Sequence, residues 1–233
     1  MHFLTKWSNQ LPLSVPCYKW IYFENTPSFA AYPKLPGYPL DSQYLSKNIG
    51  TLSSELGSFL SALHKIPISF PSLEIHRRNW KQKYEKFYIQ VQTYVLDQLE
   101  KDLRDWVKQR WNRFLQDEGQ FDFRPVWIHG DLSANHILIN DRIVTGIIDW
   151  GDVGIGDPAF DLAALSYEFG EEWMKHVITQ YTVEIDDHFF RRANFYVKIA
   201  PLHRLLYALN TRQPLQWEKG IEQLNKFYKH EMI

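Results

Sequence analysis

The chain has 233 residues, of which 45% are hydrophobic, 16% aromatic and 23% charged. This composition predicts a globular protein with an ample core, and the formal net charge of −1 provides no overall basic field for nucleic acid or an anionic membrane surface. No apolar run reaches membrane-spanning length, the first ten residues lack the apolar core of a signal peptide, and a single cysteine excludes an internal disulfide framework, so we expect a cytoplasmic protein.

The amino-terminal part is predicted to be short and mixed. Residues 1–7 are typical of the end of a helix, and two apolar runs, residues 17–23 and 28–32, predict a pair of strands. Cys17 falls in the first run and is predicted to be an inert core residue. The segment PKLPGYPL, residues 33–40, predicts a linker between subdomains. A two-stranded hairpin alone is marginal in water and leaves edges unpaired, so either helices cover it or further strands precede it.

Most of the remaining chain is predicted to be helical. Apolar residues recur at helical spacing over residues 46–66, and again over residues 74–118, which form one long helix or two. The many Trp and Tyr residues of this second segment fit core packing, or alternatively an apolar groove. Further helices are predicted over residues 159–181, over residues 187–209 with Pro201 inside, and over residues 215–228, which Pro214 opens.

A small sheet is predicted in the middle of the chain, around the segment VWIHGDLSANHILIN. The runs VWI and HILI read as buried strands. Asn140-Asp141 is a turn signal, and the run IVTGIID returns as a second strand, so HILIN and IVTGIID are predicted to form a β-hairpin. The far end of this hairpin carries Asp149.

Between these strands lies a loop whose residues are suited to phosphoryl transfer. Asp131 follows a buried strand and is predicted to accept a proton from a hydroxyl as a general base. His136 and Asp149 are expected to converge on a cation, although Mg²⁺ prefers oxygen to an imidazole ligand. Phosphoryl transfer needs this positioning and charge neutralisation more than covalent chemistry. The alternative for His136 is a contact to the cation through water.

Neighbouring polar residues have structural interpretations. His129 is expected to hydrogen-bond the backbone and brace the loop. Asp157 before Pro158 suits the start of a helix. A zinc hydrolase with His129, Asp131 and His136 as ligands is a weaker reading, because no His-Glu-x-x-His or paired-cysteine pattern supports it.

The segments HGDLSANHILI and GIIDWGDVGIGDPAFDLA together resemble the antibiotic phosphotransferases of the kinase-like superfamily. The pattern is most similar to the aminoglycoside phosphotransferases that act on the 2″ hydroxyl and to the macrolide phosphotransferases. Both carry a His where most relatives carry Asn, and this matches His136. The resemblance implies that Asp131 is the catalytic base, that His136 and Asp149 hold Mg²⁺ on the nucleotide phosphates, and that Asp161 braces the catalytic loop.

The resemblance also implies a nucleotide site and a substrate site. Residues 32–35 match the family's hinge, where the Pro33 carbonyl and the Leu35 amide would bond the base of ATP or GTP, and Ile148 would form the floor of the base pocket. Three glutamates follow on the next predicted helix and could hold a polycationic aminoglycoside, or could be only a solvated helix face. They are Glu168, Glu171 and Glu172.

The expected fold is therefore α+β and protein-kinase-like, with a mainly helical carboxyl-terminal lobe (residues 37–233) that contains the catalytic hairpin. Residues 1–36 would be a remnant of the small amino-terminal β lobe and hinge, because no strand lysine and no phosphate-covering loop are present upstream. The expected activity is transfer of the terminal phosphate of ATP or GTP to a hydroxyl of a small molecule, of the aminoglycoside or macrolide type. The alternative is a truncated, inactive relative that serves as a binding or scaffold module. The sequence predicts no nucleic-acid or membrane partner and leaves the oligomeric state open.

Overall fold

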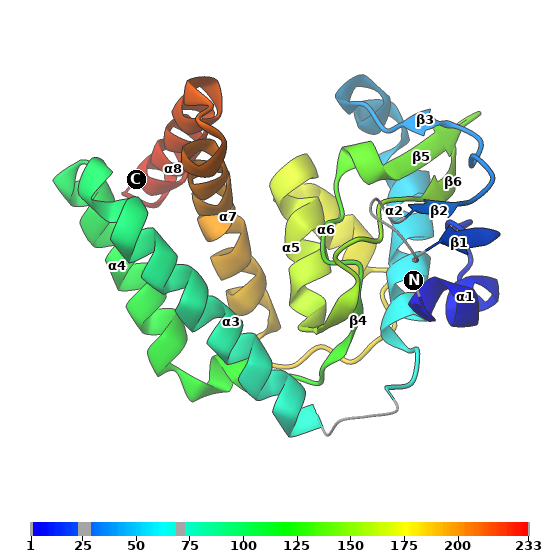
Figure 1. Ribbon diagram of the computed structural model, residues 1–233, viewed down its shortest axis with the longest axis horizontal. Helices are drawn as coiled ribbons and strands as arrows, with labels where there is room; N and C mark the ends of the chain where they lie inside the picture. Colours follow the sequence, from blue (N-terminus) through cyan, green and yellow to red (C-terminus); the bar gives the residue numbers. More distant parts are fainter. Residues whose placement is uncertain (1, 23–28, 69–72, 233) are drawn as a thin grey trace. The chain divides into compact units, whose positions relative to one another are not determined.

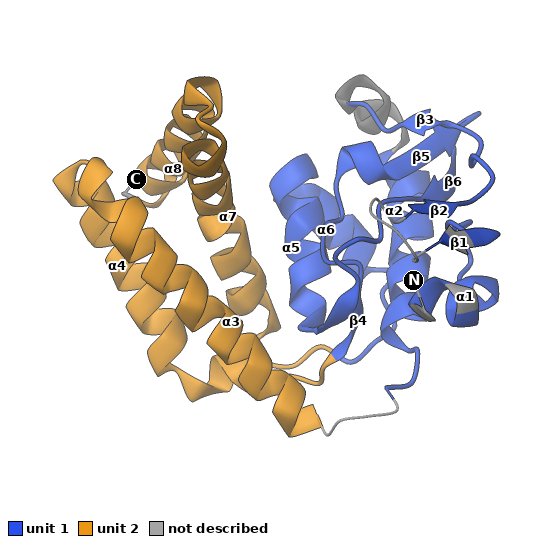
Figure 2. Ribbon diagram, viewed as in Figure 1, with its two compact units in different colours: residues 1–70, 126–184 blue, residues 71–125, 185–233 orange. Residues whose placement is uncertain are grey.

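The computed structural model describes residues 2–22, 29–68 and 73–232, and it divides into two compact units (Figure 1, Figure 2). Unit 1 comprises residues 1–70 and 126–184, and unit 2 comprises residues 71–125 and 185–233. Each unit thus joins segments that are far apart in the sequence. These units are defined by contacts within the chain and do not test the predicted boundary between the two lobes at residues 36 and 37. That boundary stays a prediction.

Unit 1 contains the small strands, four α-helices and two 3-10 turns among the residues that the structure describes (Figure 1). Its helical elements are α1 (His2–Trp7), η1 (Ser8–Gln10), α2 (Ser42–His64), η4 (Ala134–His136), α5 (Pro158–Phe169) and α6 (Glu171–Ile178), of which η1 and η4 are 3-10 turns. Its strands are β1 (Trp20–Tyr22), β2 (Phe29–Ala31), β3 (Tyr38–Pro39), β4 (Val126–Ile128), β5 (Ile137–Asn140), β6 (Ile143–Ile147) and β7 (Gly154–Gly156).

The predicted hairpin is confirmed by the pairing of β5 with β6. The two strands are antiparallel, with Asn140 opposite Ile143. Asp141 and Arg142 form the two-residue turn, with φ angles of 47° and 72°. Positive φ at both positions is the geometry whose twist matches that of the flanking strands. The hairpin therefore carries the chain directly from η4, before β5, to Asp149, just after β6.

Two short strands were not predicted. β3 pairs with β5, with Tyr38 opposite Ile139, although this segment was interpreted as linker. Its proline is tolerated because β3 lies at the edge of its sheet. β7 pairs with β4, with Val126 opposite Gly156. Two of its three residues are glycines, which weaken any strand signal in the sequence, and the segment was therefore interpreted as loop.

Helix α2 supplies the core of unit 1. It packs against β4, β6, α5 and α6, and the apolar residues that face them are fully buried. Full burial of each such side chain contributes about 1.5–3 kcal/mol. The fully buried residues are Leu52, Leu56, Phe59, Leu60 and Leu63.

The helix predicted over residues 159–181 is interrupted, which is a correction. Gly170 has a φ of 93°, and its N–H bonds the carbonyl oxygen of Ser166 at 2.9 Å, which ends α5. α6 then starts at Glu171. A left-handed glycine is a common helix terminator, but isolated glycines also occur within helices, so the sequence alone did not decide this.

Unit 2 consists of α3 (Leu73–Tyr94), η2 (Leu96–Gln98), α4 (Lys101–Gln116), η3 (Glu118–Phe121), α7 (Phe189–Thr211) and α8 (Pro214–Met232). The segment of residues 74–118 thus forms two α-helices, α3 and α4, which was one of the two predicted alternatives. Its aromatic residues pack in the core: Trp80 donates to the Tyr196 hydroxyl at 2.9 Å, and Phe114 stacks on Phe195 with ring centroids 3.7 Å apart. This favours core packing over an apolar groove for these residues.

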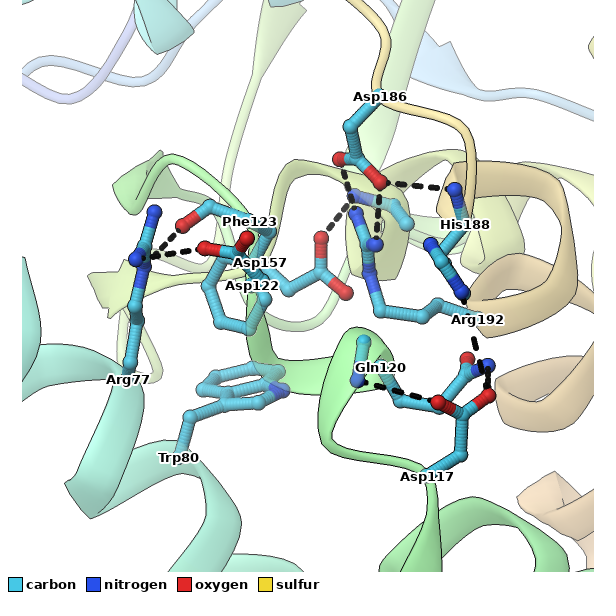
Figure 3. Close-up of polar contacts among 12 residues, drawn as sticks. Arg77, Trp80, Asp117, Gln120, Asp122, Phe123, Asp157, Asp186, His188 and Arg192 are labelled. Atoms are coloured by element: carbon cyan, nitrogen blue, oxygen red, sulfur yellow. Dashed lines mark hydrogen bonds and ion pairs between the residues drawn. The ribbon is translucent and has the colours of Figure 1, made fainter.

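A buried ion pair fixes the start of α7. Both terminal nitrogens of Arg192 bond the Asp186 carboxylate at 2.7 Å, and the Arg192 side chain is fully buried (Figure 3). A planar guanidinium matches a carboxylate through two parallel hydrogen bonds. The pairing lowers the pKa of Asp186, although its partial burial acts in the opposite direction.

The prediction that Cys17 is a core residue is wrong. Its side chain is exposed and it precedes β1, which begins only at Trp20. Trp20, Ile21 and Tyr22 pair with β2, and the Lys19 N–H bonds the carbonyl oxygen of Ala31 at 2.8 Å, whereas Cys17 lies before this pairing.

Candidate active site

Asp131, His136 and Asp149 lie together in unit 1, as their positions in the sequence predicted. The imidazole of His136 lies between the two carboxylates: its Nδ1 is 3.6 Å from Oδ2 of Asp131, and its Nε2 is 3.4 Å from Oδ2 of Asp149. The side chains of Asp131 and Asp149 are more than half exposed, whereas that of His136 is 17% exposed. The two acids can therefore reach molecules in solution while the imidazole is held in place.

His136 differs slightly from the prediction that it opens a strand. It is the last residue of η4, where its N–H bonds the carbonyl oxygen of Ser133 at 3.0 Å, and β5 begins one residue later. The 3-10 turn is stabilised by local hydrogen bonds that an apolar pattern does not reveal. The carbonyl oxygen of His136 then accepts the N–H of Ile148 at 2.9 Å, which ties this turn to the residue before Asp149.

The protonation of the His136 ring follows from its contacts. Nδ1 lies 2.6 Å from the backbone carbonyl oxygen of Asp131. Because a carbonyl oxygen only accepts, Nδ1 carries a proton. In the neutral ring, Nε2 then carries a lone pair on the side that faces Asp149. A neutral imidazole with a free lone pair is the form that binds a metal.

Asp161 braces the catalytic loop from below, as expected. Its carboxylate is fully buried and accepts the backbone N–H of His129 at 2.8 Å and that of Gly130 at 3.0 Å. Burial alone would raise the pKa of Asp161, but hydrogen bonding and the charges of nearby groups, those of His64 foremost, hold it below the usual value. The ionised carboxylate therefore fixes the two residues that precede Asp131.

His129 braces the same loop through its side chain, as predicted. Its Nε2 donates to the carbonyl oxygen of Ile148 at 3.0 Å, and its Nδ1 accepts the backbone N–H of Asp131 at 3.3 Å. Burial lowers the pKa of His129, so the neutral ring with both nitrogens satisfied is the stable form. The ring thereby links the Asp131 loop to the Asp149 strand end.

Two further residues of this brace were not singled out in the sequence. Nε2 of His64, on α2, lies 3.2 Å from Oδ2 of Asp161, and its Nδ1 lies 2.6 Å from the hydroxyl of Tyr181. The carboxylate of Asp161 only accepts, so Nε2 of His64 carries the proton between them. Burial, followed by the charges of Asp161 and Asp157, raises the pKa of Tyr181, so its hydroxyl stays protonated and can donate a hydrogen bond to Nδ1. The only signal in the sequence was a histidine in the apolar register of a helix.

Asp149 occupies an unusual backbone conformation. Its φ is 61°, in the left-handed region that aspartate tolerates better than most residues. The next residue, Trp150, is buried, and its Nε1 donates to the carbonyl oxygen of Ile147 at 3.0 Å. The tryptophan anchors the strand end from inside, and the reversed backbone leaves the Asp149 side chain 61% exposed.

The donor set of this site fits a hard divalent cation that is also bound by phosphates. Two neighbouring ligands of an octahedral ion with bonds of about 2.1 Å are about 3 Å apart, and Nε2 of His136 and Oδ2 of Asp149 are 3.4 Å apart. Among the residues described, no group of three or more His, Cys, Asp or Glu side chains could hold a metal by itself. This argues against the zinc-hydrolase alternative, because zinc sites use three or four protein ligands, whereas Mg²⁺ takes one or two plus phosphate and water.

The expected hinge lies beside the catalytic hairpin. Thr145 donates from its hydroxyl to the carbonyl oxygen of Pro36 at 2.6 Å, and a methyl group added at Gly146 would lie 3.0 Å from Cδ1 of Leu35. Leu35 and Ile148 are half-buried and Pro33 is exposed. The roles of these three residues in nucleotide binding stay predictions.

Tyr18, which the sequence did not single out, also lies near this region. Its ring meets that of Tyr32 edge-on, with centroids 5.5 Å apart. Burial, followed by the charges of Tyr32 and Asp149, raises the pKa of Tyr18. The phenol therefore stays neutral beside the expected hinge.

The three glutamates of the expected substrate site are exposed and do not share one helix. Glu168 lies in the last turn of α5, whereas Glu171 and Glu172 begin α6 after the break at Gly170. Lys175 pairs with both of the latter, at 3.5 and 2.8 Å. Exposed pairs of this kind are weak and break readily, so a substrate role for the glutamates stays a prediction.

Comparisons with known proteins agree with the geometry. A family model described as "Phosphotransferase enzyme family" matches residues 1–193. A solved structure, the GDP and kanamycin complex of APH(2″)-IIIa, superposes with a TM-score of 0.85 at 26% identity, covering 99% of this chain and 80% of that one. The expectation of a kinase-like α+β fold is thereby confirmed.

Curated relatives have a similar level of identity. The chain is 25% identical over 223 residues to the uncharacterized protein YcbJ of Bacillus subtilis (strain 168), covering 86% of this chain and 70% of the relative. It is 27% identical over 168 residues to viomycin phosphotransferase of Streptomyces vinaceus, covering 65% of this chain and 54% of the relative.

In the part of the chain that the structure describes, none of the helices combines the length and the apolar character needed to cross a membrane.

Proposed function

The chain belongs to the phosphotransferase enzyme family, and on that premise we propose that it transfers the terminal phosphate of ATP or GTP to a hydroxyl of a small antibiotic of the aminoglycoside or macrolide type. The observation that carries the proposal is the His136 imidazole held between the carboxylates of Asp131 and Asp149. The solved relative in complex with GDP and kanamycin supports both the nucleotide and the class of acceptor.

Asp131 serves as the general base. As the acceptor hydroxyl attacks the terminal phosphorus, its proton passes to an Asp131 carboxylate oxygen. The new oxygen–phosphorus bond forms while the bond to the bridging oxygen breaks, and the nucleoside diphosphate leaves. A base positioned in this way contributes a factor of about 10²–10⁴ in rate. The brace by Asp161 and His129 holds the backbone of the loop that carries the Asp131 carboxylate. The base is therefore positioned before the acceptor binds, and no ordering of the loop is needed in each catalytic cycle.

Asp149 and the Nε2 of His136 would hold Mg²⁺, which neutralises charge on the nucleotide phosphates when bound. Both side chains are fixed from behind, Asp149 by the buried Trp150 that follows it and His136 by its Nδ1 bond to the Asp131 carbonyl. The Pro33 carbonyl, the Leu35 amide and Ile148 would receive the base. We propose a cytoplasmic location, where ATP and GTP are available and where a single free cysteine stays reduced.

The test is a transfer assay on the chain with Mg²⁺, ATP or GTP, and a panel of kanamycin, viomycin and a macrolide. Mass spectrometry would show a product heavier by one phosphate group, and its loss in Asp149→Asn would tie transfer to this site. Nucleotide binding without a product from any acceptor of the panel would contradict the antibiotic assignment.

A further inference from the structure

Unit 2 contains a cavity of about 580 Å³, and none of its lining residues belongs to the unit that carries the candidate active site or takes part in the chemistry above. It lies between the end of α4, η3 and the start of α7. Three arginines line it, Arg110, Arg113 and Arg191. Its size is within the range of small-molecule sites.

The residues that line this cavity carry a net positive charge. Its one acidic lining residue, Asp117, is already engaged, because its carboxylate accepts the N–H of Gly119 at 3.1 Å and the Gln120 amide at 2.7 Å (Figure 3). The same carboxylate lies 4.0 Å from Nε2 of His188. Three arginines therefore line the cavity with one carboxylate, whose pKa is lowered first by the Gln120 hydrogen bond and further by the charges of His188 and Arg191.

The arginines retain donors for a ligand. Arg113 and Arg191 form no hydrogen bond or ion pair with another residue in the described part of the chain. Arg110 is held by an ion pair with Glu231 and lies over the Trp106 ring, yet its Nε is buried without a partner among the described residues. A buried donor without an acceptor is costly, so an acceptor that reaches this Nε would be favourable.

The arginines also repel one another. Burial, followed by the charge of Arg113, lowers the pKa of Arg110 to about 10, which still leaves the group protonated at neutral pH. An anion between the two would relieve this repulsion. Guanidinium groups match carboxylate and phosphate oxygens through paired hydrogen bonds.

The walls of the cavity are aromatic as well as basic. Phe114 and Phe195 line it, and their rings stack with an interplanar angle of 5°. An apolar wall lowers the local polarity, which strengthens charge interactions beside it.

We propose that this arginine cavity binds a small molecule with at least two negatively charged oxyanion groups, phosphate or carboxylate. The experiment below compares phosphate-containing and carboxylate-containing anions, so it distinguishes these two groups. The proposal does not depend on the phosphotransferase activity, because no residue of the cavity belongs to the candidate active site.

The experiment is isothermal titration calorimetry of the whole chain with inorganic phosphate, pyrophosphate and citrate, in EDTA and without nucleotide. Pyrophosphate, citrate or both are expected to bind more tightly than inorganic phosphate, and the tighter of the two identifies the preferred group. Arg113→Gln and Arg191→Gln are each expected to weaken this binding about tenfold, because each removes a charge-assisted hydrogen bond. Asp149→Asn is expected to bind these anions with the wild-type affinity. A changed affinity in this variant would mean that the anions bind at the candidate active site and not in the arginine cavity.

Arg124→Gln is the matched control, because Arg124 is exposed, lies in the same unit and does not line the cavity. Circular dichroism and the urea midpoint check that each variant is folded. Absence of binding by all three anions overturns the proposal. So does unchanged affinity in both cavity variants, or an equal loss in Arg124→Gln.

Discussion

The Nδ1 atom of His136 lies 2.6 Å from the backbone carbonyl oxygen of Asp131, so the expected metal ligand is fastened to the expected base. The base and the ligand are thus positioned by one hydrogen bond, and a shift of the loop would displace both. Substitutions at His136 and at the residues that brace the loop can therefore distinguish metal binding by His136 from positioning of Asp131.

His136→Asn is expected to keep most of the turnover, whereas His136→Ala is expected to need about ten times more Mg²⁺ for half-maximal turnover. The amide oxygen of asparagine is a ligand that Mg²⁺ accepts, and alanine offers none. The measurement is turnover against Mg²⁺ concentration for the two variants. Equal Mg²⁺ dependence in the alanine variant and the wild type would contradict a ligand role.

Asp161→Asn is expected to lower the free energy of unfolding by about 3 kcal/mol, because an amide group would face backbone N–H donors in a fully buried place. Asp152→Asn is the control, because Asp152 is exposed. Urea unfolding followed by circular dichroism measures both. A loss no larger than that of the control would show that Asp161 is not the brace described above.

The buried His129 makes stability depend on pH. Because burial lowers its pKa in the folded state, the unfolded chain binds more protons below a pH of about 6.5, and this contribution to stability is lost as the pH falls. We expect the urea midpoint to decrease between pH 7.5 and 5.5. The decrease should be smaller in His129→Gln, and an unchanged pH profile in that variant would assign the effect to other groups.

Gly130→Ala is expected to destabilise the chain by about 2 kcal/mol. Gly130 has a φ of 85°, and an added Cβ would lie 2.4 Å from the carbonyl oxygen of Asp152. The control is Gly154→Ala, where the same oxygen would be 3.7 Å away, an ordinary contact. Thermal unfolding compares them, and similar melting temperatures would show that the loop relaxes without cost.

The candidate site was predictable because its residues stand at the ends of strands with strong apolar patterns. Asp131 follows β4 and Asp149 follows β6, so the alternation of apolar runs and turns placed both. The brace was only partly predictable. Asp161 entered through the family resemblance, whereas His64 and Tyr181 are 117 residues apart, and neither carries a local signal of their contact.

The parts of the fold that were missed depend on tertiary contacts. β7 consists of a glycine-rich segment that becomes a strand only because β4 lies beside it, and β3 becomes one only at the edge of β5. Cys17 was assigned to the core because an apolar run does not reveal where strand pairing begins. The break at Gly170 depends on a backbone angle that the residue type permits but does not require.

The most direct test of the central claim is the turnover of Asp131→Asn once an acceptor is known. The carboxylate is more than half exposed, and within the described residues its one polar contact is with Nδ1 of His136 at 3.6 Å. Its replacement should therefore leave the chain folded and its affinity for Mg²⁺ and nucleotide unchanged. The account predicts that kcat falls by a factor of about 10²–10⁴. A variant that transfers phosphate at the wild-type rate would contradict the assignment of Asp131 as the base.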